Sequence, residues 1–252
     1  MIKHPLRHQI KFSFLKHQFS AYSWLILIFL LVLYGLLKLG LWQLDRQQEK
    51  AKLLQSIEDI QSSQPLNLSV TYQEVKDYQP VYFEGKALNS PTVLIANEPL
   101  DGRDGYHVLN LLQLDSGVEV WVNRGWIAAL PDRRNLPVLP ELNERWSGTG
   151  EVYFSKGKPI LYDHALEQRN ERIWVLQGRD FSLLKDIANS GQSTRLPFII
   201  RISENTDNGL QQRWQYVSMS PSKHLAYAIQ WFGLALALTV IVLIISITKK
   251  ES

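Results

Sequence analysis

Two long runs of apolar residues, one near each end of the 252-residue chain, dominate its hydrophobic pattern. The first extends from Trp24 to Leu44 and the second from Leu225 to Thr248. A helix needs about 20 apolar residues to cross the hydrocarbon core of a bilayer. The first run is longer than the apolar core of a cleavable signal peptide, and no Ala-x-Ala cleavage site follows it. We therefore predict two transmembrane helices, over residues 22–44 and 224–248.

The apolar segments between these runs are short and rich in β-branched and aromatic residues, which favours strands. The clearest pattern is a hairpin whose strands, Tyr106–Leu114 and Val118–Ile127, are joined by Asp115-Ser116-Gly117. Every second residue from Val118 to Val122 is valine, so these side chains share one face of the strand. Further strands are predicted at five places: Val81–Gly85, Thr92–Ala96, Gly150–Phe154, Pro197–Ile202 and Leu210–Val217.

Helical and loop segments are also predicted in the middle of the chain. Leucine and isoleucine residues between Leu44 and Ile57 recur at helical spacing, so the first helix should continue for several turns beyond the membrane. Asp180 is a candidate N-cap for a short helix over residues 181–190, which Gly191 would end. Residues 131–140 form a proline-rich loop between strands.

The charge pattern predicts an orientation for the two helices. Residues 1–44 carry five basic and no acidic side chains, and two lysines and one glutamate follow the second run. Short basic flanks stay in the cytoplasm. The predicted order is a basic cytoplasmic N-terminus (1–21), a transmembrane helix (22–44), an extracytoplasmic domain (45–223), a second transmembrane helix (224–248) and a cytoplasmic tail (249–252). No long presequence is evident, which favours a bacterial inner membrane with a periplasmic domain. The predicted fold class is therefore an α+β membrane protein: two transmembrane helices flanking a β-rich, mainly antiparallel domain.

Composition excludes several functional classes. The chain has no cysteine, which rules out disulfides, thiolate metal sites, a cysteine nucleophile and c-type haem attachment. The ends carry +6 against a formal net charge of +3, so the middle carries −3, and such a domain is not expected to bind nucleic acid. The sequence has no nucleophile elbow, zinc-protease, P-loop or dinucleotide-binding motif. We therefore expect a protein that is not an enzyme.

Four short patches carry a family resemblance. They begin at Gly40 (GLWQLDR), at Val81 (VYFEG, followed by G-x-x-G-Y over residues 102–106), at Val120 (VWVNRGWI) and at His224 (HLAYAIQWFGLA). With the two apolar runs, they resemble the Surfeit-locus (SURF/Shy) family of cytochrome c oxidase assembly proteins over residues 24–248. The resemblance implies a role in assembling haem-copper cytochrome c oxidase, near the insertion of haem a into the catalytic subunit.

The resemblance also directs attention to the outer ends of the two helices. His224 is the candidate ligand of haem iron, because imidazole binds haem iron in many proteins. Trp42 and Arg46 are four residues apart, so they can stack on one helical face and reach a haem propionate. Tyr227 and Trp231 complete the predicted haem site. The competing interpretation is that these residues anchor the helix ends at the lipid head groups and contact no haem.

The other patch residues are predicted to have structural or partner-binding roles: Gly40, Gln43, Asn123, Arg124, Gly125, Trp126 and Gln230. Gly125 permits a bulge or a positive φ where a strand is expected to end. Two roles are open for Arg124, an ion pair with an acidic group inside the domain or a bidentate contact with a propionate. His107, in a strand, and His164, in a loop, lack the spacing of a metal site.

Two main functional hypotheses follow. In the first, the protein is an assembly factor that binds haem a transiently, without any permanent cofactor, and contacts the oxidase catalytic subunit and the haem a synthesis machinery. In the second, it is a membrane scaffold that binds oxidase subunits without contacting haem. A third class, an extracytoplasmic sensor, would need a cytoplasmic output domain, and only a few residues follow the second apolar run.

Overall fold

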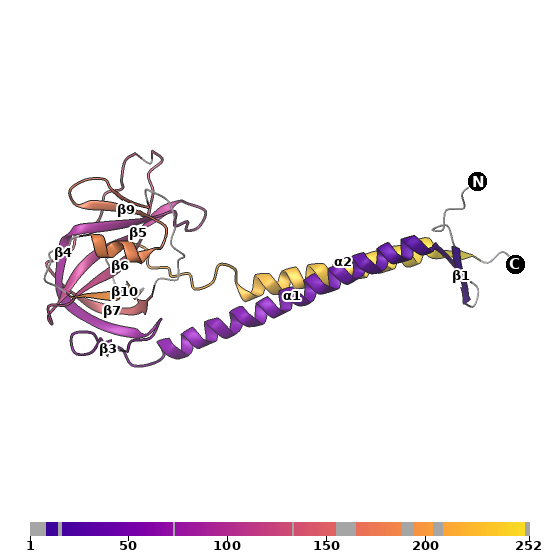
Figure 1. The fold of residues 1–252 in the computed structure, drawn as a ribbon, viewed down its shortest axis with the longest axis horizontal. Coiled ribbons are helices and arrows are strands. Elements are labelled where there is room, and N and C mark those ends of the chain that lie inside the picture. Colours follow the sequence, from indigo (N-terminus) through magenta and orange to yellow (C-terminus); the bar gives the residue numbers. More distant parts are fainter. Residues whose placement is uncertain are drawn as a thin grey trace. The chain divides into compact units, whose positions relative to one another are not determined.

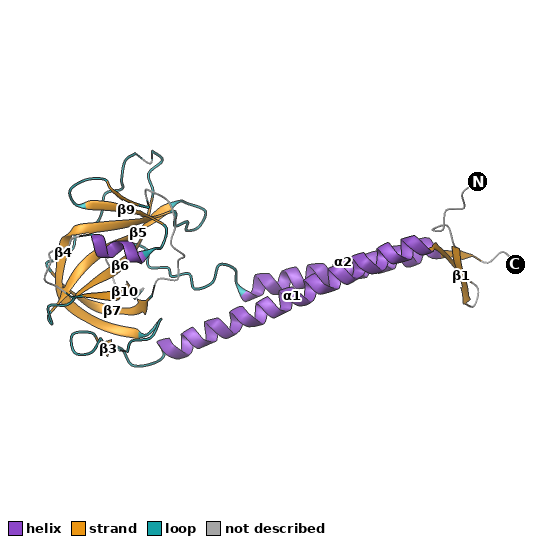
Figure 2. Cartoon of the chain, in the orientation of Figure 1, coloured by secondary structure: helices purple, strands orange, loops and turns teal. Residues whose placement is uncertain are grey.

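The computed structural model describes residues 9–249 except 15–16, 73, 133, 155–164, 188–193 and 204–208. The chain divides into two compact units. The helix unit comprises Met1–Gln55 and Tyr216–Ser252, and the β unit comprises Ser56–Gln215. Figure 2 shows that helices form most of the first unit and strands most of the second. His164 lies outside the described residues.

Two long helices form most of the helix unit (Figure 1). Helix α1 extends from Ser23 to Gln61 and α2 from Pro221 to Ser246. Both are long and apolar enough to cross a membrane, judged by length and composition, and only 6% and 11% of their most apolar segments are buried. A helix inside a soluble core would have most of that surface covered. The expected continuation of the first helix beyond Leu44 is confirmed.

A small antiparallel sheet accompanies the helices. Its strands are β1 (Gln9–Phe14), β2 (His17–Tyr22) and β11 (Ile247–Lys249), in the order β1-β2-β11. β2 leads directly into α1, and β11 follows directly after α2. The charge pattern predicted basic segments at these two places and no strand. Apolar residues do alternate with polar ones from Ile10 to Phe14, which is the pattern of a strand.

Beyond the last turns of α1, the described residues of the β unit form eight strands and one short 3-10 helix (Figure 1). The elements are β3 (Leu66–Asn67), β4 (Pro80–Ala96), β5 (Gly105–Leu114), β6 (Glu119–Ala128), β7 (Arg145–Tyr153), β8 (Leu166–Gln168), β9 (Ile173–Gln177), η1 (Phe181–Asp186) and β10 (Arg195–Ile202). Five of the pairings between these strands are antiparallel, and three are parallel: β3–β4, β4–β9 and β6–β10. The predicted β-rich, mainly antiparallel character is confirmed.

Five of these strands close into a ring. β4 pairs with β5, β5 with β6, β6 with β10, β10 with β7, and β7 with β4 again. β4 is 17 residues long and pairs along different parts of its length with β3, β5, β7 and β9, and its register with β5 shifts between Leu88 and Thr92. Closure leaves these strands with hydrogen-bonded neighbours on both sides, which is how barrels avoid exposed edges.

Three predictions about the β unit need correction. Val81–Gly85 and Thr92–Ala96 belong to one strand, β4, because the chain bends without leaving the sheet. Leu210–Val217 does not form a strand, and only Gln211 makes a bridge, with Trp126. Asp180 does cap a helix, accepting a hydrogen bond from the Ser182 N–H, but this helix is a 3-10 helix that ends at Asp186.

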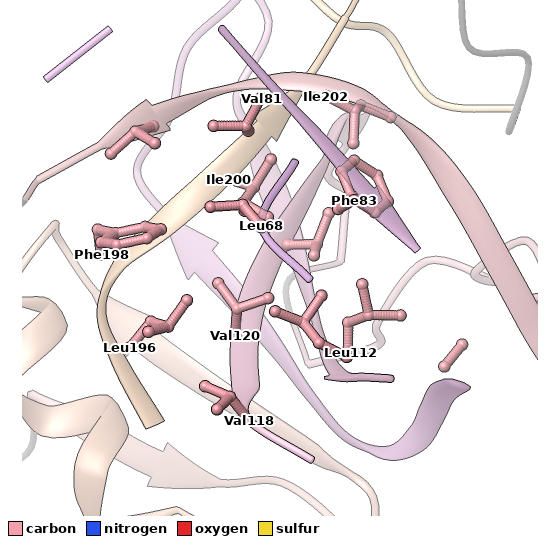
Figure 3. Packing of buried hydrophobic residues seen from close by; sticks show 14 residues of the cluster. Leu68, Val81, Phe83, Leu112, Val118, Val120, Leu196, Phe198, Ile200 and Ile202 are labelled. Carbon is pink, nitrogen blue, oxygen red and sulfur yellow. The ribbon is translucent and has the colours of Figure 1, made fainter. Parts of the chain in front are cut away.

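The ring encloses the main hydrophobic core. Side chains from every strand of the ring meet there, and Figure 3 shows Phe83, Leu112, Val120 and Phe198 converging from different strands. The predicted valine face is confirmed, because Val118, Val120 and Val122 all belong to this core. The predicted hairpin is confirmed as well, with Gly117 at a φ of +81° in its turn. This core fixes the strands on which the polar groups of the β unit lie.

Candidate functional site

The seam between α1 and α2 is built on small residues. Gly40 of α1 is buried and lies against the ring of Phe232, so closely that a Cβ at Gly40 would be 2.5 Å from the nearest ring carbon. On α2, Ala228 and Ala235 are buried although most neighbouring residues are exposed. Small side chains let the backbones of two helices approach each other closely. The role of Gly40 is therefore close packing.

His224 is held at this seam by Gln43. The Nδ1 atom of His224 and Oε1 of Gln43 are 2.7 Å apart, and His224 is 8% exposed. An amide oxygen only accepts hydrogen bonds, so with this contact Nδ1 carries a proton, and the neutral imidazole then has its lone pair on Nε2. Histidines that bind metals usually have this arrangement, in which the second ring nitrogen donates to an oxygen. Gln43 and His224, which were both singled out from the sequence, thus form a hydrogen-bonded pair.

The first turn of α2 fixes where His224 lies. Pro221 is the first residue of the helix, a position that tolerates proline because its missing N–H would have no helical partner. The Ser220 hydroxyl accepts a hydrogen bond from the Lys223 N–H at 3.4 Å, and the Ser220 carbonyl accepts one from the His224 N–H at 3.3 Å. The run from Ser220 to Lys223 therefore acts as a helix start that sets the histidine in the first turn.

Trp42 and Arg46 lie together but apart from this pair. The Arg46 guanidinium is 5.8 Å from the centre of the Trp42 ring, which confirms the predicted stacking. Arg46 also donates a 2.6 Å hydrogen bond to Glu49, and both Trp42 and Arg46 are exposed. Neither makes a hydrogen bond, ion pair or ring contact with His224 within the described part of the chain. The residue of α1 that reaches His224 is Gln43.

The remaining candidates on α2 differ in exposure. Tyr227 and Gln230 are exposed, and Trp231 is partly buried. His224, Ala228, Trp231 and Ala235 recur at intervals of four, three and four residues, so they share one helical face. Trp231 therefore belongs to the seam, whereas Tyr227 and Gln230 are available to lipid or to a partner.

In the β unit, the Asn123–Trp126 patch forms a β-bulge inside β6. The register with β5 shifts between Leu109, which faces Asn123, and Val108, which faces Gly125, so Arg124 is the extra residue. Gly125 has a φ of +128°, and its N–H donates to the Asn123 side-chain oxygen at 3.1 Å. The predicted bulge and positive φ are both confirmed. The strand does not end here, because it continues to Ala128.

The bulge places Arg124 inside the β unit. Arg124 is 2% exposed, and its guanidinium donates to the carbonyl oxygens of Pro140 at 3.0 Å and Glu141 at 3.5 Å, and to the side-chain oxygen of Asn110 at 3.4 Å. These contacts tie the proline-rich loop to the sheet. Burial lowers the pKa of Arg124 to about 10, so the side chain remains charged at neutral pH.

Trp126 belongs to a buried polar cluster that the sequence did not predict. Its Nε1–H donates to the Glu98 carbonyl oxygen at 2.6 Å, and the Glu98 carboxylate accepts two hydrogen bonds from Arg179. His107 stacks on Trp214 with ring centres 5.3 Å apart, and its Nε2 is 4.0 Å from Glu98. Burial lowers the pKa of His107 to about 4. No local motif links residues from four distant segments, so sequence reasoning had no signal for this cluster.

Comparisons with known proteins agree with this architecture. A SURF1-like protein of Rickettsia felis is 27% identical over 235 residues, which cover 86% of this chain and 95% of that protein. A SURF1-like protein of Dictyostelium discoideum is 32% identical over 118 residues, covering 42% of this chain and 43% of the relative. The Saccharomyces cerevisiae protein named cytochrome oxidase assembly protein SHY1 is 29% identical over 168 residues, which cover 64% of this chain and 42% of the yeast protein. The match thus spans less than half the length of the last two relatives.

The family match is broader than any of the four patches. The model of the SURF1 family matches residues 30–236, a range that contains the seam between the helices and the whole β unit. On this evidence the chain belongs to the SURF1 family.

Proposed function

We propose that this protein is a membrane-anchored assembly factor for haem-copper cytochrome c oxidase that assists the delivery of haem a to the catalytic subunit. Membership of the SURF1 family and the similarity to a yeast protein named for cytochrome oxidase assembly support the first part. The hydrogen bond between Gln43 and His224 is the observation that carries the second part. A histidine that binds haem iron through Nε2 is usually held by a hydrogen bond from Nδ1 to an oxygen atom, and Gln43 supplies such an oxygen.

The residues at the seam suit haem a as a transient cargo. Haem iron takes an axial imidazole nitrogen, and the propionates of haem require cations. His224 would offer Nε2 to the iron while Gln43 holds Nδ1. Positive charge lies close by in the sequence, on Arg46, three residues after Gln43 in α1, and on Lys223, next to His224 in the first turn of α2. Because His224 is 8% exposed, access to Nε2 depends on how the seam opens to the cargo.

Membrane anchoring is the second element of the proposal. The apolar segments of α1 and α2 would cross the bilayer with both basic ends in the cytoplasm, which places the β unit in the periplasm of a bacterial inner membrane. Gln43 and His224 would then lie near the outer interface, where an amphipathic haem is most easily exchanged. The protein would act by binding and not by catalysis, in contact with the oxidase catalytic subunit and with the haem a synthesis machinery.

Purification from cells that make haem a tests the haem part directly. The wild type should carry a haem absorbance, and His224→Ala should lose it. Gln43→Ala should keep the iron ligand but shift the haem midpoint potential, because the imidazole loses its hydrogen-bond partner. Gln48→Ala, a glutamine exposed on the same helix, is the matched control and should change neither signal. Equal haem content in the wild type and in His224→Ala would refute haem binding at this site.

A scaffold without haem is the second candidate, and the tight packing of Gly40 on Phe232 favours it. A scaffold needs the two helices paired, but it does not need His224. Oxidase activity in membranes separates the two candidates: a scaffold retains activity in His224→Ala and loses it in Gly40→Leu. Normal oxidase activity in a strain lacking the whole protein would contradict both.

A further inference from the structure

The β unit contains a cavity of about 370 Å³ that lies away from the buried cluster around Glu98. Its lining comes from three adjacent strands (Thr92, Asn110 and Arg124), from residues 139–142 between β6 and β7, and from Arg172 and Ile173 at the beginning of β9. Pockets for small organic ligands start at about 300 Å³ and combine apolar walls with a few polar groups. This cavity has the size of such a pocket, and its lining is more polar than apolar.

The floor of the cavity is a row of hydrogen-bonded polar side chains. Asn110 donates to the Thr92 hydroxyl at 2.8 Å and accepts from Arg124 at 3.4 Å. All three residues are less than 10% exposed, and they lie on the neighbouring strands β4, β5 and β6. Bulges redirect side chains at functional positions, and it is the bulge in β6 that places Arg124 in this row. The floor is therefore rigid and positively charged.

Two arginines, Arg124 and Arg172, line the same space. Arg124 is charged and almost fully buried, and its guanidinium donates to Asn110, Pro140 and Glu141, which all line the cavity as well. Arg172 is exposed, and its side chain makes no ion pair within the described part of the chain. Glu141 contacts Arg124 through its backbone oxygen, and its side chain is exposed. With two arginines in its lining, the cavity should attract an anion, which can accept charge-assisted hydrogen bonds from a guanidinium group.

The other walls are apolar. Leu139 and Leu142 come from the segment between β6 and β7, and Ile173 begins β9. We propose that the cavity binds a small organic carboxylate, whose head group lies between Arg124 and Arg172 and whose hydrocarbon part contacts these three side chains. A carboxylate fits better than a phosphate ester, because desolvating a single negative charge against apolar walls costs less than desolvating two. The cavity lies entirely within the β unit, so the proposal is independent of the Gln43–His224 pair.

Titration of the purified full chain in non-ionic detergent tests this proposal. Hexanoate is the probe, hexanamide is its neutral counterpart, and binding is followed by saturation-transfer NMR with a detergent-only blank. Hexanoate should bind at least about tenfold more tightly than hexanamide, because a charge-assisted hydrogen bond distinguishes them. Inorganic phosphate should compete weakly or not at all. Equal binding of hexanoate and hexanamide, or tighter binding of phosphate than of hexanoate, would overturn the proposal.

Three variants locate the site. Arg172→Gln removes an exposed side chain, so the fold should persist while hexanoate affinity falls about tenfold. Arg103→Gln, an exposed arginine outside the cavity lining, is the matched control and should bind as the wild type does. His224→Ala should also bind hexanoate normally, so a failure of the haem proposal would leave this one standing. Unchanged hexanoate affinity in Arg172→Gln would refute the assignment of the cavity.

Discussion

Mild acid should destabilise the β unit through one buried histidine. His107 lies on β5, stacked on Trp214, and its ring faces the carboxylate of Glu98 and the guanidinium groups of Arg179 and Arg201. Burial is the largest cause that lowers its pKa, from 6.5 to about 4, and the attraction of Glu98 offsets this only in part. The folded state therefore holds His107 neutral at pH values where the unfolded chain has already bound a proton.

The sign and the size of the effect follow from linkage. Because the pKa is lower in the folded state, the stabilising contribution is complete above about pH 6.5 and is lost as the pH falls toward 4. Each pH unit in this window costs about 1.4 kcal/mol. Between pH 7 and pH 5 the loss is about 2 kcal/mol, which is a large part of a stability that is about 5–15 kcal/mol for ordinary domains.

Urea unfolding of the full chain in non-ionic detergent, followed by tryptophan fluorescence at pH 7 and pH 5, measures this loss. His107→Phe keeps a ring against Trp214 but cannot bind a proton, so the difference between the two pH values should shrink by about 2 kcal/mol relative to the wild type. His17→Phe changes a histidine of β2, outside the β unit, and should leave the pH dependence intact. The same pH dependence in His107→Phe as in the wild type would show that this histidine is not the sensitive group.

Three substitutions test the packing described above. Gly40→Leu should lower the free energy of unfolding by about 1–3 kcal/mol, because the new side chain clashes with Phe232. Adding Phe232→Ala to the same chain should restore much of this stability, as measured by thermal melting followed by circular dichroism. Destabilising effects of the two substitutions that simply add would contradict the packing of Gly40 on Phe232. Gly125→Ala should cost about 1–3 kcal/mol in urea unfolding, because a φ of +128° strains any residue with a Cβ; wild-type stability would mean that the bulge relaxes. Trp126→Phe leaves the buried Glu98 carbonyl oxygen without its indole donor and should cost about 1–3 kcal/mol by the same assay, and no change would mean that another donor replaces it.

Local patterns predicted the elements that local physics controls. The two apolar runs gave α1 and α2, and the valine alternation in β6 gave a hairpin with the correct face inward, because both signals come from periodicity within one segment. The bulge at Arg124 was also readable, since glycine tolerates positive φ in a strand. Elements of this kind depend on neighbours within about ten residues.

The pairing of distant segments could not be read in this way. Nothing in the residues of β10 says that it lies between β6, to which it is parallel, and β7. The candidate site shows the same limit: Trp42 was predicted beside His224 from a shared helix end, whereas the register of α1 and α2 brings Gln43 there. A helix end fixes the height of a residue but not the face that meets its partner, and the contacts across the seam decide that face.

The position of β10 in the ring has a consequence for how the protein is made. β10 is the last strand in the chain among the described residues of the β unit, yet it completes the ring by joining β6 to β7. Until residues 195–202 have been synthesised, β6 and β7 each present an unpaired edge, and unpaired edges favour aggregation. Closing the ring also pairs strands that are far apart in the sequence, β6 and β10, and such long-range contacts slow folding. Because α2 begins at Pro221, soon after β10, the β unit reaches its final topology at nearly the same stage of synthesis as the second helix.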